Sequence, residues 1–451
     1  MVHQSAIKKF REKLHGSLLF PRDSGYHEAR SVWNGRIDRK PMAIARCKDT
    51  SDVIASINFA RDHQLLVSIR GGGHHAAGHA VSDGGLMIDL SLMNEIYVDP
   101  TIKIAKAGPG TSVRDLDHET QKFGLVITGA PVSTVGIAGY TLGGGLGWTS
   151  RKHGLACDNL ISVDVVTAEG ELIHASEDKY PNLFWGIRGG SGNFGVVTSF
   201  EFQLHEMGPD VLAGPIVHPI EEAPRLLRFW RDYMLDAPDE LQCMPVMFNT
   251  PESETVFCLY PLYAGNPAEG ESVIKPFREI GTPLSDGIEA TSYADLLSEL
   301  DEMYRSGDRN YYRSAFFDSI PDEAIDTFVE KAAPIPSPFS SIFLEPLGGA
   351  IARRDTHATA FPHRERKFCI TAVPKWDDEN RDEEMMAWAD ELFNALKPYA
   401  ADGVYVNYLD EVGDEPARDA YGQHWNRLTE LKKKWDPENL FRMNHNVPPA
   451  G

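Results

Sequence analysis

The sequence predicts an α+β fold divided into two domains, and three observations support this prediction. The chain has 451 residues, more than a single hydrophobic core ordinarily holds. Segments with the apolar spacing of helices alternate with β-branched runs typical of strands. The composition, 42% hydrophobic with 39 glycines and 29 prolines, is that of a globular protein with many turns.

The first half of the chain predicts one clear helix and several strands. Residues 51–63 have the apolar periodicity of a helix, with Ser51 as a candidate N-cap. Residues 163–175 predict two strands around a turn at Glu169-Gly170. Further apolar, β-branched runs predict strands at residues 65–69, 85–90 and 196–202.

The character of the sequence changes near residue 208, where Gly208-Pro209 and Gly214-Pro215 interrupt it. Beyond this point the patterns predict an amphipathic helix at 385–396, a short aromatic strand at 404–408 and a helix near 425–434. We therefore expect one domain formed by residues 1–207 and joined by the segment 398–451, and a second domain formed by residues 208–397.

The most distinctive motif follows the predicted strand at 65–69. Its glycines let the backbone turn sharply and bring several N–H groups close to a ligand, which suits a phosphate. A histidine at the rim adds a nucleophilic nitrogen. Taken alone, the motif is equally compatible with a glycine turn beside a surface histidine. Its residues are Arg70, Gly71, Gly72, Gly73, His74 and His75.

Two further glycine clusters follow. Residues 143–147, shortly after the segment 134–140, supply a second turn in the same domain. Two such turns suit a ligand longer than one phosphate, such as a dinucleotide, although tight packing explains them equally well. Residues 190–195 match the pattern G-x-G-x-x-G, but a β-branched strand rather than a helix follows at Val196. That order argues against a nicotinamide-type Rossmann site.

Other catalytic patterns are weaker. His74, His75 and His79 lie close together in the sequence, but no carboxylate or thiolate has matching spacing, so we expect no metal site. The sequence lacks the G-x-S-x-G of serine hydrolases and the G-K-[ST] of P-loops. Tyr408 suits a core position, and a tyrosine there becomes a general base only where its phenolate is stabilised.

Charge and cysteine content restrict the function further. The net charge of −22 disfavours nucleic acid and anionic membranes as partners. The five cysteines are odd in number and lack CxxC spacing, which indicates reduced thiols. The N-terminal segment has no secretory pattern, and no apolar run has the length of a membrane helix. We expect a cytoplasmic protein.

Taken together, the motifs resemble the berberine-bridge-enzyme-like FAD oxidases of the vanillyl-alcohol-oxidase and p-cresol-methylhydroxylase superfamily. The resemblance runs in order from Tyr26 to the C-terminus and is strongest at 65–90, 131–160, 183–202 and 404–449. The chain looks most like the small bacterial members. The resemblance implies an FAD-binding domain of two subdomains, and a substrate domain whose antiparallel sheet is covered by helices.

The resemblance also assigns roles to residues. Arg70 to His74 would surround the pyrophosphate of FAD, and His74 would carry the flavin covalently. Tyr408 matches the position of the catalytic tyrosine. Other expected contacts are the cofactor-lining residues His75, Thr134, Gly136, Gly139, Tyr140 and Gly145, then Val197 at the adenine end, and Asn446 near the flavin ring.

Two departures from the family pattern matter. Val132 stands where many relatives have a second flavin-linking cysteine, so we expect attachment through His74 only. Ile370 stands where some relatives have a catalytic carboxylate, which weakens any transfer of the alkaloid ring-closing mechanism.

The implied activity is that of an oxidase. It would take hydride from a CH–OH or CH–N carbon of a small molecule to FAD, with Tyr408 as the base, and would reduce oxygen to hydrogen peroxide. The alternatives are a dehydrogenase with a quinone or protein acceptor, and a non-redox flavin-binding carrier. Sugars, alcohols, amines and polyketides all remain open as substrates, and the protein would be a monomer or homodimer.

Overall fold

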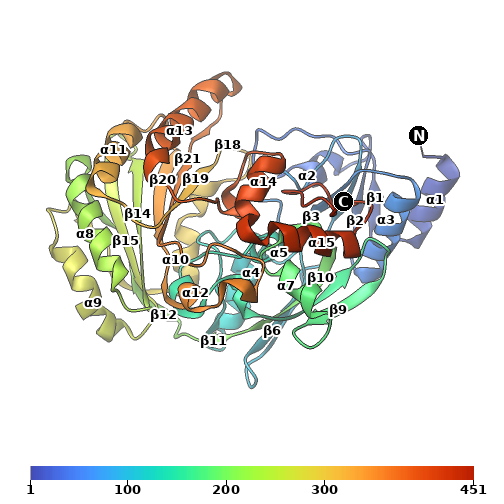
Figure 1. Cartoon of the computed structure of the whole chain (residues 1–451), viewed down its shortest axis with the longest axis horizontal. Helices are drawn as coiled ribbons and strands as arrows, with labels where there is room; N and C mark the ends of the chain where they lie inside the picture. The colour runs from blue at the N-terminus through green and yellow to red at the C-terminus, as the bar shows by residue number, and fades with distance from the viewer. Residues whose placement is uncertain (1) are drawn as a thin grey trace.

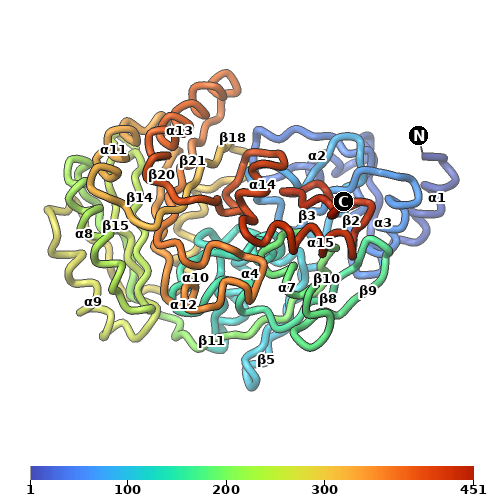
Figure 2. The backbone as a smooth tube through the Cα atoms, viewed as in Figure 1, coloured from blue at the N-terminus to red at the C-terminus, as the bar shows by residue number. Residues whose placement is uncertain are grey.

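The computed structural model describes residues 2–451 as an elongated molecule with two halves. In Figure 1 the N-terminal elements lie at one end, and a large sheet with its covering helices lies at the other. Figure 2 shows the C-terminal segment returning to the N-terminal half. Among the described residues, none of the helices combines the length and apolar character that crossing a membrane requires.

The N-terminal half begins with a sheet of strand order β1-β2-β4-β3, in which β4 runs parallel to both β2 and β3. Helix α3 (Thr50–Asp62) follows β2 and leads to β3, as a parallel arrangement requires. The remaining elements are α1 (Gln4–Lys13), β1 (Ser17–Leu19), α2 (Tyr26–Arg30), β2 (Ala43–Arg46), β3 (Val67–Arg70) and β4 (Leu86–Asp89).

A second, antiparallel sheet has the order β5-β6-β10-β8-β9. A separate short pair joins β7 to β11. The strands are β5 (Ile96–Asp99), β6 (Ile104–Ala107), β7 (Leu125–Val126), β8 (Leu160–Val166), β9 (Leu172–Ser176), β10 (Val196–Gln203) and β11 (His205–Glu206). The helices in this part are α4 (Val113–Gln121), α5 (Ile137–Leu142), α6 (Ser150–His153) and α7 (Pro181–Ile187).

The third sheet has nine strands, and its main path is β16-β13-β15-β14-β20-β21-β19. Strand β12 pairs antiparallel with β15 and β17. The strands are β12 (Asp210–Ala213), β13 (Ile216–Pro219), β14 (Leu241–Asn249), β15 (Thr255–Tyr263), β16 (Ser285–Asp286), β17 (Glu289–Ser292), β19 (Arg313–Phe317), β20 (Ser341–Pro346) and β21 (Phe368–Val373). A short separate pair consists of β18 (Arg309–Asn310) and β22 (Lys375–Trp376).

Helices cover the outer face of the nine-stranded sheet (Figure 1). Their apolar faces share one core cluster with the strands, in which Trp230, Phe277, Phe328 and Leu392 are buried. The covering helices are α8 (Ala223–Leu235), α9 (Pro267–Glu279), α11 (Asp322–Ala332) and α13 (Asp382–Leu396). The predicted α+β class and the antiparallel sheet covered by helices are confirmed. The shorter α10 (Tyr293–Glu299) and α12 (Gly349–Arg353) lie nearer the N-terminal half.

Most predicted elements are present with boundaries shifted by a few residues. The predicted helix at 51–63 is α3, but its N-cap is Asp49, whose carboxylate accepts the N–H groups of Ser51 and Asp52. The predicted strand at 404–408 is wrong, because Val406–Tyr408 forms the 3₁₀ helix η8. Tyr405 instead turns its hydroxyl to the N–H groups of Gly145 and Leu146.

The division into two domains stays a proposal. Every strand of the nine-stranded sheet lies between Asp210 and Val373, which supports a boundary near residue 207. The C-terminal helices α14 (Asp414–Tyr421) and α15 (Trp425–Trp435) return to the first half, where α15 contacts α7. We propose that residues 398–451 belong with residues 1–207.

A buried ion pair holds this returning segment. The Lys432 ammonium lies 2.8 Å from the Asp436 carboxylate and donates to the carbonyls of Asn193 and Phe441, each at 2.8 Å. Burial lowers the pKa of Lys432 to about 8. Asp436 also accepts the N–H groups of Leu440 and Phe441. The pair therefore fixes the final turn of the chain against the loop before β10.

Replacing Lys432 tests this arrangement. Lys432→Met leaves the Asp436 carboxylate buried without its cation, and we expect the free energy of unfolding to fall by about 3–5 kcal/mol. Urea denaturation followed by circular dichroism measures the change. The control is Lys433→Met, because Lys433 is exposed and its loss should change stability by no more than ~0.5 kcal/mol. Equal effects of the two substitutions would contradict the role of the pair.

Candidate active site

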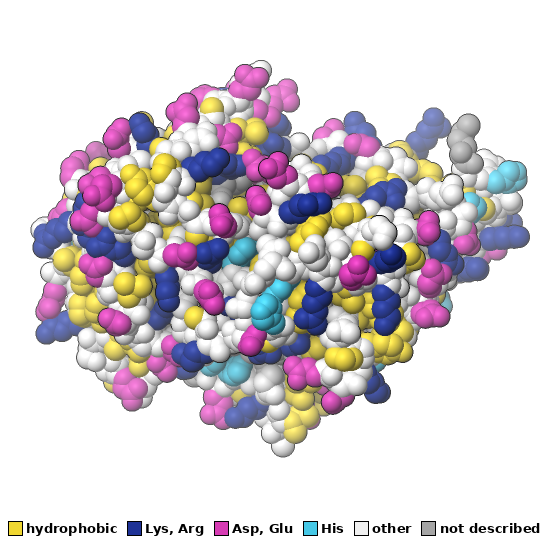
Figure 3. All heavy atoms as spheres, in the orientation of Figure 1, with side chains coloured by type: hydrophobic (Ala, Val, Ile, Leu, Met, Phe, Trp, Pro, Cys, Tyr) yellow, Lys and Arg dark blue, Asp and Glu magenta, His cyan; other side chains and the backbone are white. Residues whose placement is uncertain are grey.

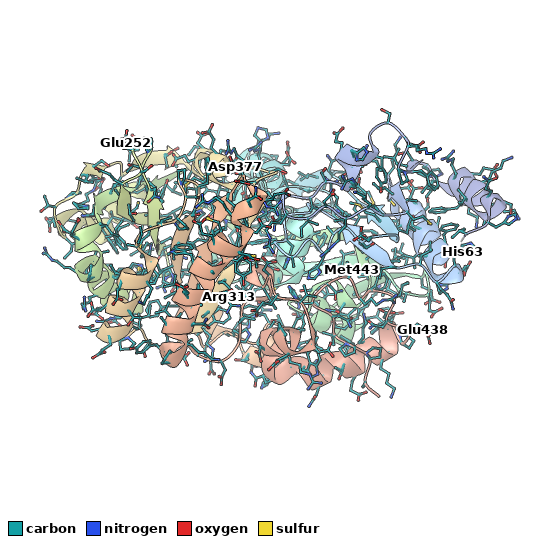
Figure 4. The ribbon with its side chains drawn as sticks, turned by 90° about the horizontal axis from the view of Figure 1, so that it is seen from above. His63, Glu252, Arg313, Asp377, Glu438 and Met443 are labelled. Carbon is teal, nitrogen blue, oxygen red and sulfur yellow. The ribbon has the colours of Figure 1, made fainter. Side chains whose placement is uncertain are left out.

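A cavity of about 310 Å³ lies between the two halves of the molecule. One wall consists of the loop after β3, residues of the 130–140 segment and residues 441–445. The other wall contains residues of β14, β15 and β20. Figure 4 places the lining residue Met443 near the middle of the molecule. The two glycine-rich turns singled out in the sequence thus reach a common space.

Most of the predicted site residues line this cavity. They are Gly71, Gly72, Gly73, His74, His75, Gly136, Gly139, Tyr140, Val197 and Tyr408. Four others lie beside the lining. Arg70 donates to the carbonyl of Ala29 at 2.6 Å, and Thr134 places its hydroxyl 3.4 Å from His74 Nε2. Gly145 precedes the lining residue Leu146, and Asn446 follows the lining residues Asn444 and His445.

The two glycine turns cross at Gly72 and Gly136. A Cβ added to Gly72 would lie 2.6 Å from the Cα of Gly136, and one added to Gly136 would lie 2.5 Å from the Cα of Gly72. Such distances are too short for any side chain, so only two glycines permit this approach. The next residue, Gly73, has φ +69°, a conformation that also favours glycine. The crossing exposes backbone rather than side chains to the cavity.

Trp33 fixes the imidazole of His74. The two rings stack with centroids 4.4 Å apart and an interplanar angle of 16°. The indole N–H of Trp33 donates to the carbonyl of Tyr304 at 2.8 Å, so the stack joins both halves of the molecule. Burial lowers the pKa of His74 to about 4. The imidazole is therefore neutral near pH 7 and keeps a nucleophilic lone pair.

Tyr408 meets a buried carboxyl group that the sequence analysis missed. Its hydroxyl donates to Glu345 Oε1 at 3.3 Å. Burial raises the pKa of Glu345 to about 8. Burial, followed by the neighbouring carboxyl of Glu345, also raises the pKa of Tyr408 above its usual value. The two groups form a hydrogen-bonded pair, with Tyr408 in the wall of the cavity and Glu345 behind it.

Ile370, the position expected to carry a carboxylate in some relatives, faces away from Tyr408. It is buried in the core cluster shared with the covering helices, and it pairs with Leu344 on the neighbouring strand β20. Successive residues of a strand point to opposite faces of the sheet, so Glu345, the next residue of β20, lies on the other face, where it accepts the Tyr408 hydrogen bond. The signal for Glu345 in the sequence was one glutamate in the otherwise apolar run 342–346.

Three histidines, two from the segment after β3 and one from the C-terminal segment, lie close together beside the cavity. Ring nitrogens of His75, His79 and His445 lie within 4.8 Å of one another. Both nitrogens of His75 are engaged, one with the carbonyl of Val406 and one with the N–H of Ala77. His79 Nε2 and His445 Nδ1 are buried without a partner in the described chain. Two available nitrogens are fewer than the three or four ligands of a zinc site.

These features fit a long ligand with polar edges, such as a dinucleotide. The glycine crossing brings two backbone segments together, and both contribute to the lining of the cavity. Four buried polar atoms near the cavity have no partner in the described residues: His79 Nε2 after the β3 loop, and Asn444 Oδ1, His445 Nδ1 and Asn446 Oδ1 in the C-terminal segment. Buried groups of this kind are costly unless a ligand or water satisfies them.

Comparison with known proteins agrees with this geometry. Residues 41–176 match the family described as FAD binding domain, and residues 404–448 match the family described as berberine and berberine like. The chain is 33% identical over 456 residues to (R)-6-hydroxynicotine oxidase of Paenarthrobacter nicotinovorans, covering 97% of this chain and 98% of the relative. It is 31% identical over 448 residues to an FAD-linked oxidoreductase of Dictyostelium discoideum, covering 98% and 97%. The chain belongs to the berberine bridge enzyme-like family of FAD-linked oxidoreductases.

The berberine bridge enzyme-like protein also shares the fold of a solved relative. It superposes on 6-hydroxy-D-nicotine oxidase from Arthrobacter nicotinovorans with a TM-score of 0.88 at 31% identity, covering 97% of this chain and 98% of that structure. The resemblance inferred from the sequence motifs is confirmed, and FAD is the cofactor of this oxidoreductase family. The G-x-G-x-x-G match at 190–195 forms the short 3₁₀ helix η2 (Ser191–Asn193), and strand β10 follows it.

The glycine crossing is directly testable in this FAD-binding protein. Gly72→Ala forces the two turns apart, at a cost of about 1–3 kcal/mol, and we expect FAD binding to weaken about ten- to a hundredfold. The ratio of flavin to protein absorbance after purification measures the loss. The control is Gly208→Ala, where an added Cβ meets no atom within 4 Å. Full flavin content in Gly72→Ala would contradict the role of the crossing.

Proposed function

We propose that the protein is an oxidase that takes hydride from a CH–OH or CH–N carbon of a small molecule to covalently bound FAD and reduces oxygen to hydrogen peroxide. The observation that carries this proposal is the hydrogen bond from Tyr408, in the wall of the cavity that the glycine turns also line, to Glu345 behind that wall. When bound, FAD supplies the two-electron acceptor. The protein supplies binding, orientation and proton transfer.

The glycine-lined wall is the proposed cofactor site. Backbone groups of residues 71–73 and 136 would hold the phosphates, because these residues line the cavity and successive backbone N–H groups in a turn suit an anion. Val197 and the unpartnered polar atoms of His79, Asn444, His445 and Asn446 would contact the rest of the cofactor. The same proposal includes Arg70, His75, Thr134, Gly139, Tyr140, Gly145 and Asn446 as residues that bind FAD or position its binding loops.

Tyr408 is the proposed catalytic base, and Glu345 assists it. A hydroxyl carbon is a poor hydride donor until the O–H proton leaves. The Tyr408 oxygen would take that proton while its own proton passes to Glu345, whose Oε1 accepts the Tyr408 hydrogen bond. General-base help of this kind contributes about 10²–10⁴ in rate. Glu345 accepts a proton only when it is ionised. Because its pKa is about 8, the carboxylate predominates only above that pH.

His74 is the proposed covalent attachment site. Its neutral imidazole has a free lone pair, and Trp33 and Thr134 hold the ring at the cavity. Val132, which also lines the cavity, has no group that could form a second bond. These observations support a single linkage through His74.

Oxygen reactivity tests the oxidase against the dehydrogenase alternative without any knowledge of the substrate. The purified holoenzyme is reduced with dithionite in the absence of oxygen and then mixed with air-saturated buffer. We expect the visible flavin band to return within seconds and one hydrogen peroxide to form per flavin. A reduced flavin that persists in air but reoxidises with a quinone would instead identify a dehydrogenase.

The proton-transfer pair predicts a defined pH dependence. Because Glu345 accepts a proton only as the carboxylate, the rate of flavin reduction by substrate should rise with pH through about 8. Tyr408→Phe should lower the rate by about 10²–10⁴, and Glu345→Gln should remove the rise near pH 8. Stopped-flow absorbance without oxygen measures both effects. The exposed Tyr97 provides the control Tyr97→Phe. An unchanged rate in Tyr408→Phe would refute its role as the base.

Covalent attachment has its own test. We expect His74→Ala to bind FAD that acid precipitation releases, whereas the wild-type protein should keep one FAD after denaturation. Intact-protein mass spectrometry measures the difference. His63→Ala is the matched control, because the half-exposed His63 lies at the end of α3, away from the cavity (Figure 4). Flavin that stays attached in His74→Ala would place the linkage elsewhere.

A further inference from the structure

The cavity wall differs sharply from the outer surface in charge. Aspartate, glutamate, lysine and arginine make up 24% of the chain, and Figure 3 shows both signs distributed over the visible face. None of these four residue types is present among the described residues that line the cavity. On the cofactor side, backbone N–H groups of the glycine turns can face the phosphates, but on the side formed by β14, β15 and β20 a charged ligand group would meet no opposite charge among the lining residues.

The charges nearest the substrate side already have partners in the protein. Asp301, between the lining residues Leu300 and Met303, pairs with Arg114 and accepts the hydroxyl of Ser133. Glu299 accepts the hydroxyl of Tyr260 at 2.6 Å. These side chains are therefore compensated within the protein rather than by a ligand.

Two buried ionisable groups outside the lining also offer no free charge to a ligand near pH 7. Lys375 donates to the carbonyl of Met303, and its ammonium lies 4.0 Å from the centre of the Tyr304 ring. Glu345, bonded to Tyr408, has a pKa of about 8 because of burial and is largely neutral near pH 7. Transfer of an unpaired ion into such surroundings costs several kcal/mol.

The substrate side offers few hydrogen bonds. Its apolar members include Met244, Val246 and Phe343. Tyr260 and Tyr408 already donate to glutamates, and the Tyr304 hydroxyl lies 3.5 Å from that of Ser341. Beside Tyr260, the Trp148 indole N–H has no partner in the described residues and could donate one hydrogen bond. A sugar would leave several hydroxyl groups without partners, and each unpaired buried group costs about 1–3 kcal/mol.

The aromatic side chains form walls suited to a flat ring. Phe343 and Tyr408 meet edge to face, with centroids 5.7 Å apart and an angle of 85°. The ring centroid of Tyr312 lies 6.0 Å from that of Tyr408, with an angle of 35° between the two rings. Rings in these orientations pack favourably against a further aromatic ring.

We infer that the substrate is an uncharged, largely apolar ring compound with one oxidisable hydroxyl group, rather than a sugar, a carboxylate or a protonated amine. This inference rests on the proposed function, because it concerns the substrate of the same cavity. The hydroxyl would lie at Tyr408, and the apolar ring would contact the aromatic and aliphatic wall.

Binding of product-like ketones tests this inference without turnover. The probes are 1-indanone, which is uncharged, benzoylformate, which carries a carboxylate, and cellobionolactone, which represents a sugar. Each is titrated into the FAD-loaded protein, and the shift of the flavin spectrum gives its Kd. We expect 1-indanone to bind at least about tenfold more tightly than either of the others. Equal or tighter binding of benzoylformate or the lactone would overturn the inference.

Flavin reduction provides the second arm. Without oxygen, 1-indanol should bleach the flavin band at least about tenfold faster than mandelate, cellobiose or 2-phenylpyrrolidine at equal concentration. Faster bleaching by one of the latter three would overturn the substrate class while leaving the oxidase proposal intact. If the reduced protein fails to form peroxide in air, the oxidase proposal fails, while the ketone affinities still decide the ligand class.

A charge introduced into the wall provides a matched variant. Val246→Lys places a cation among the lining residues, and we expect it to reverse the order of affinities so that benzoylformate binds more tightly than 1-indanone. Val412→Lys is the control, because Val412 is 65% exposed and lies outside the lining. If Val246→Lys binds flavin normally but keeps the wild-type order, the assignment of this wall to the substrate is wrong.

Discussion

The close approach of Gly72 and Gly136 is the constraint on which the rest of the site depends. Neither residue has room for a Cβ, so two backbone segments meet directly where side chains would ordinarily separate them. The loop after β3 and the start of α5 thereby form one continuous wall. His74 and Thr134 face each other because they flank this crossing. The remaining walls, from the nine-stranded sheet and the C-terminal segment, close around it.

Burial then decides the protonation states inside the cavity. The same loss of water that lowers the pKa of His74 raises that of Glu345. Both shifts favour the neutral form, because a low-dielectric environment penalises either charge. The imidazole keeps its lone pair at physiological pH, whereas the carboxyl keeps its proton until the pH approaches 8. Burial alone thus leaves His74 with a nucleophilic lone pair and makes Glu345 change its protonation state near pH 8.

Local sequence patterns predicted the elements and the glycine turns well, because both depend on residues close together in the chain. The motif at residues 70–75 and the strand at 196–202 belong to this class. The patterns failed where a side chain serves a distant partner. The aromatic run at 404–408 has the composition of a strand, yet Tyr405 is there to bond Gly145 and Leu146. Glu345, Trp33 and the meeting of His79 with His445 depend on tertiary contacts, which one sequence does not contain.

The buried Lys432–Asp436 pair also has a consequence for how the cavity is assembled. It fixes residues 436–445 against the loop at Asn193, and those residues supply part of the cavity wall. The ring centroid of His75, from the loop after β3, lies 5.1 Å from that of His445. The cavity wall is therefore complete only when segments from distant parts of the sequence have packed against each other. Neither segment encloses the cavity by its local folding alone.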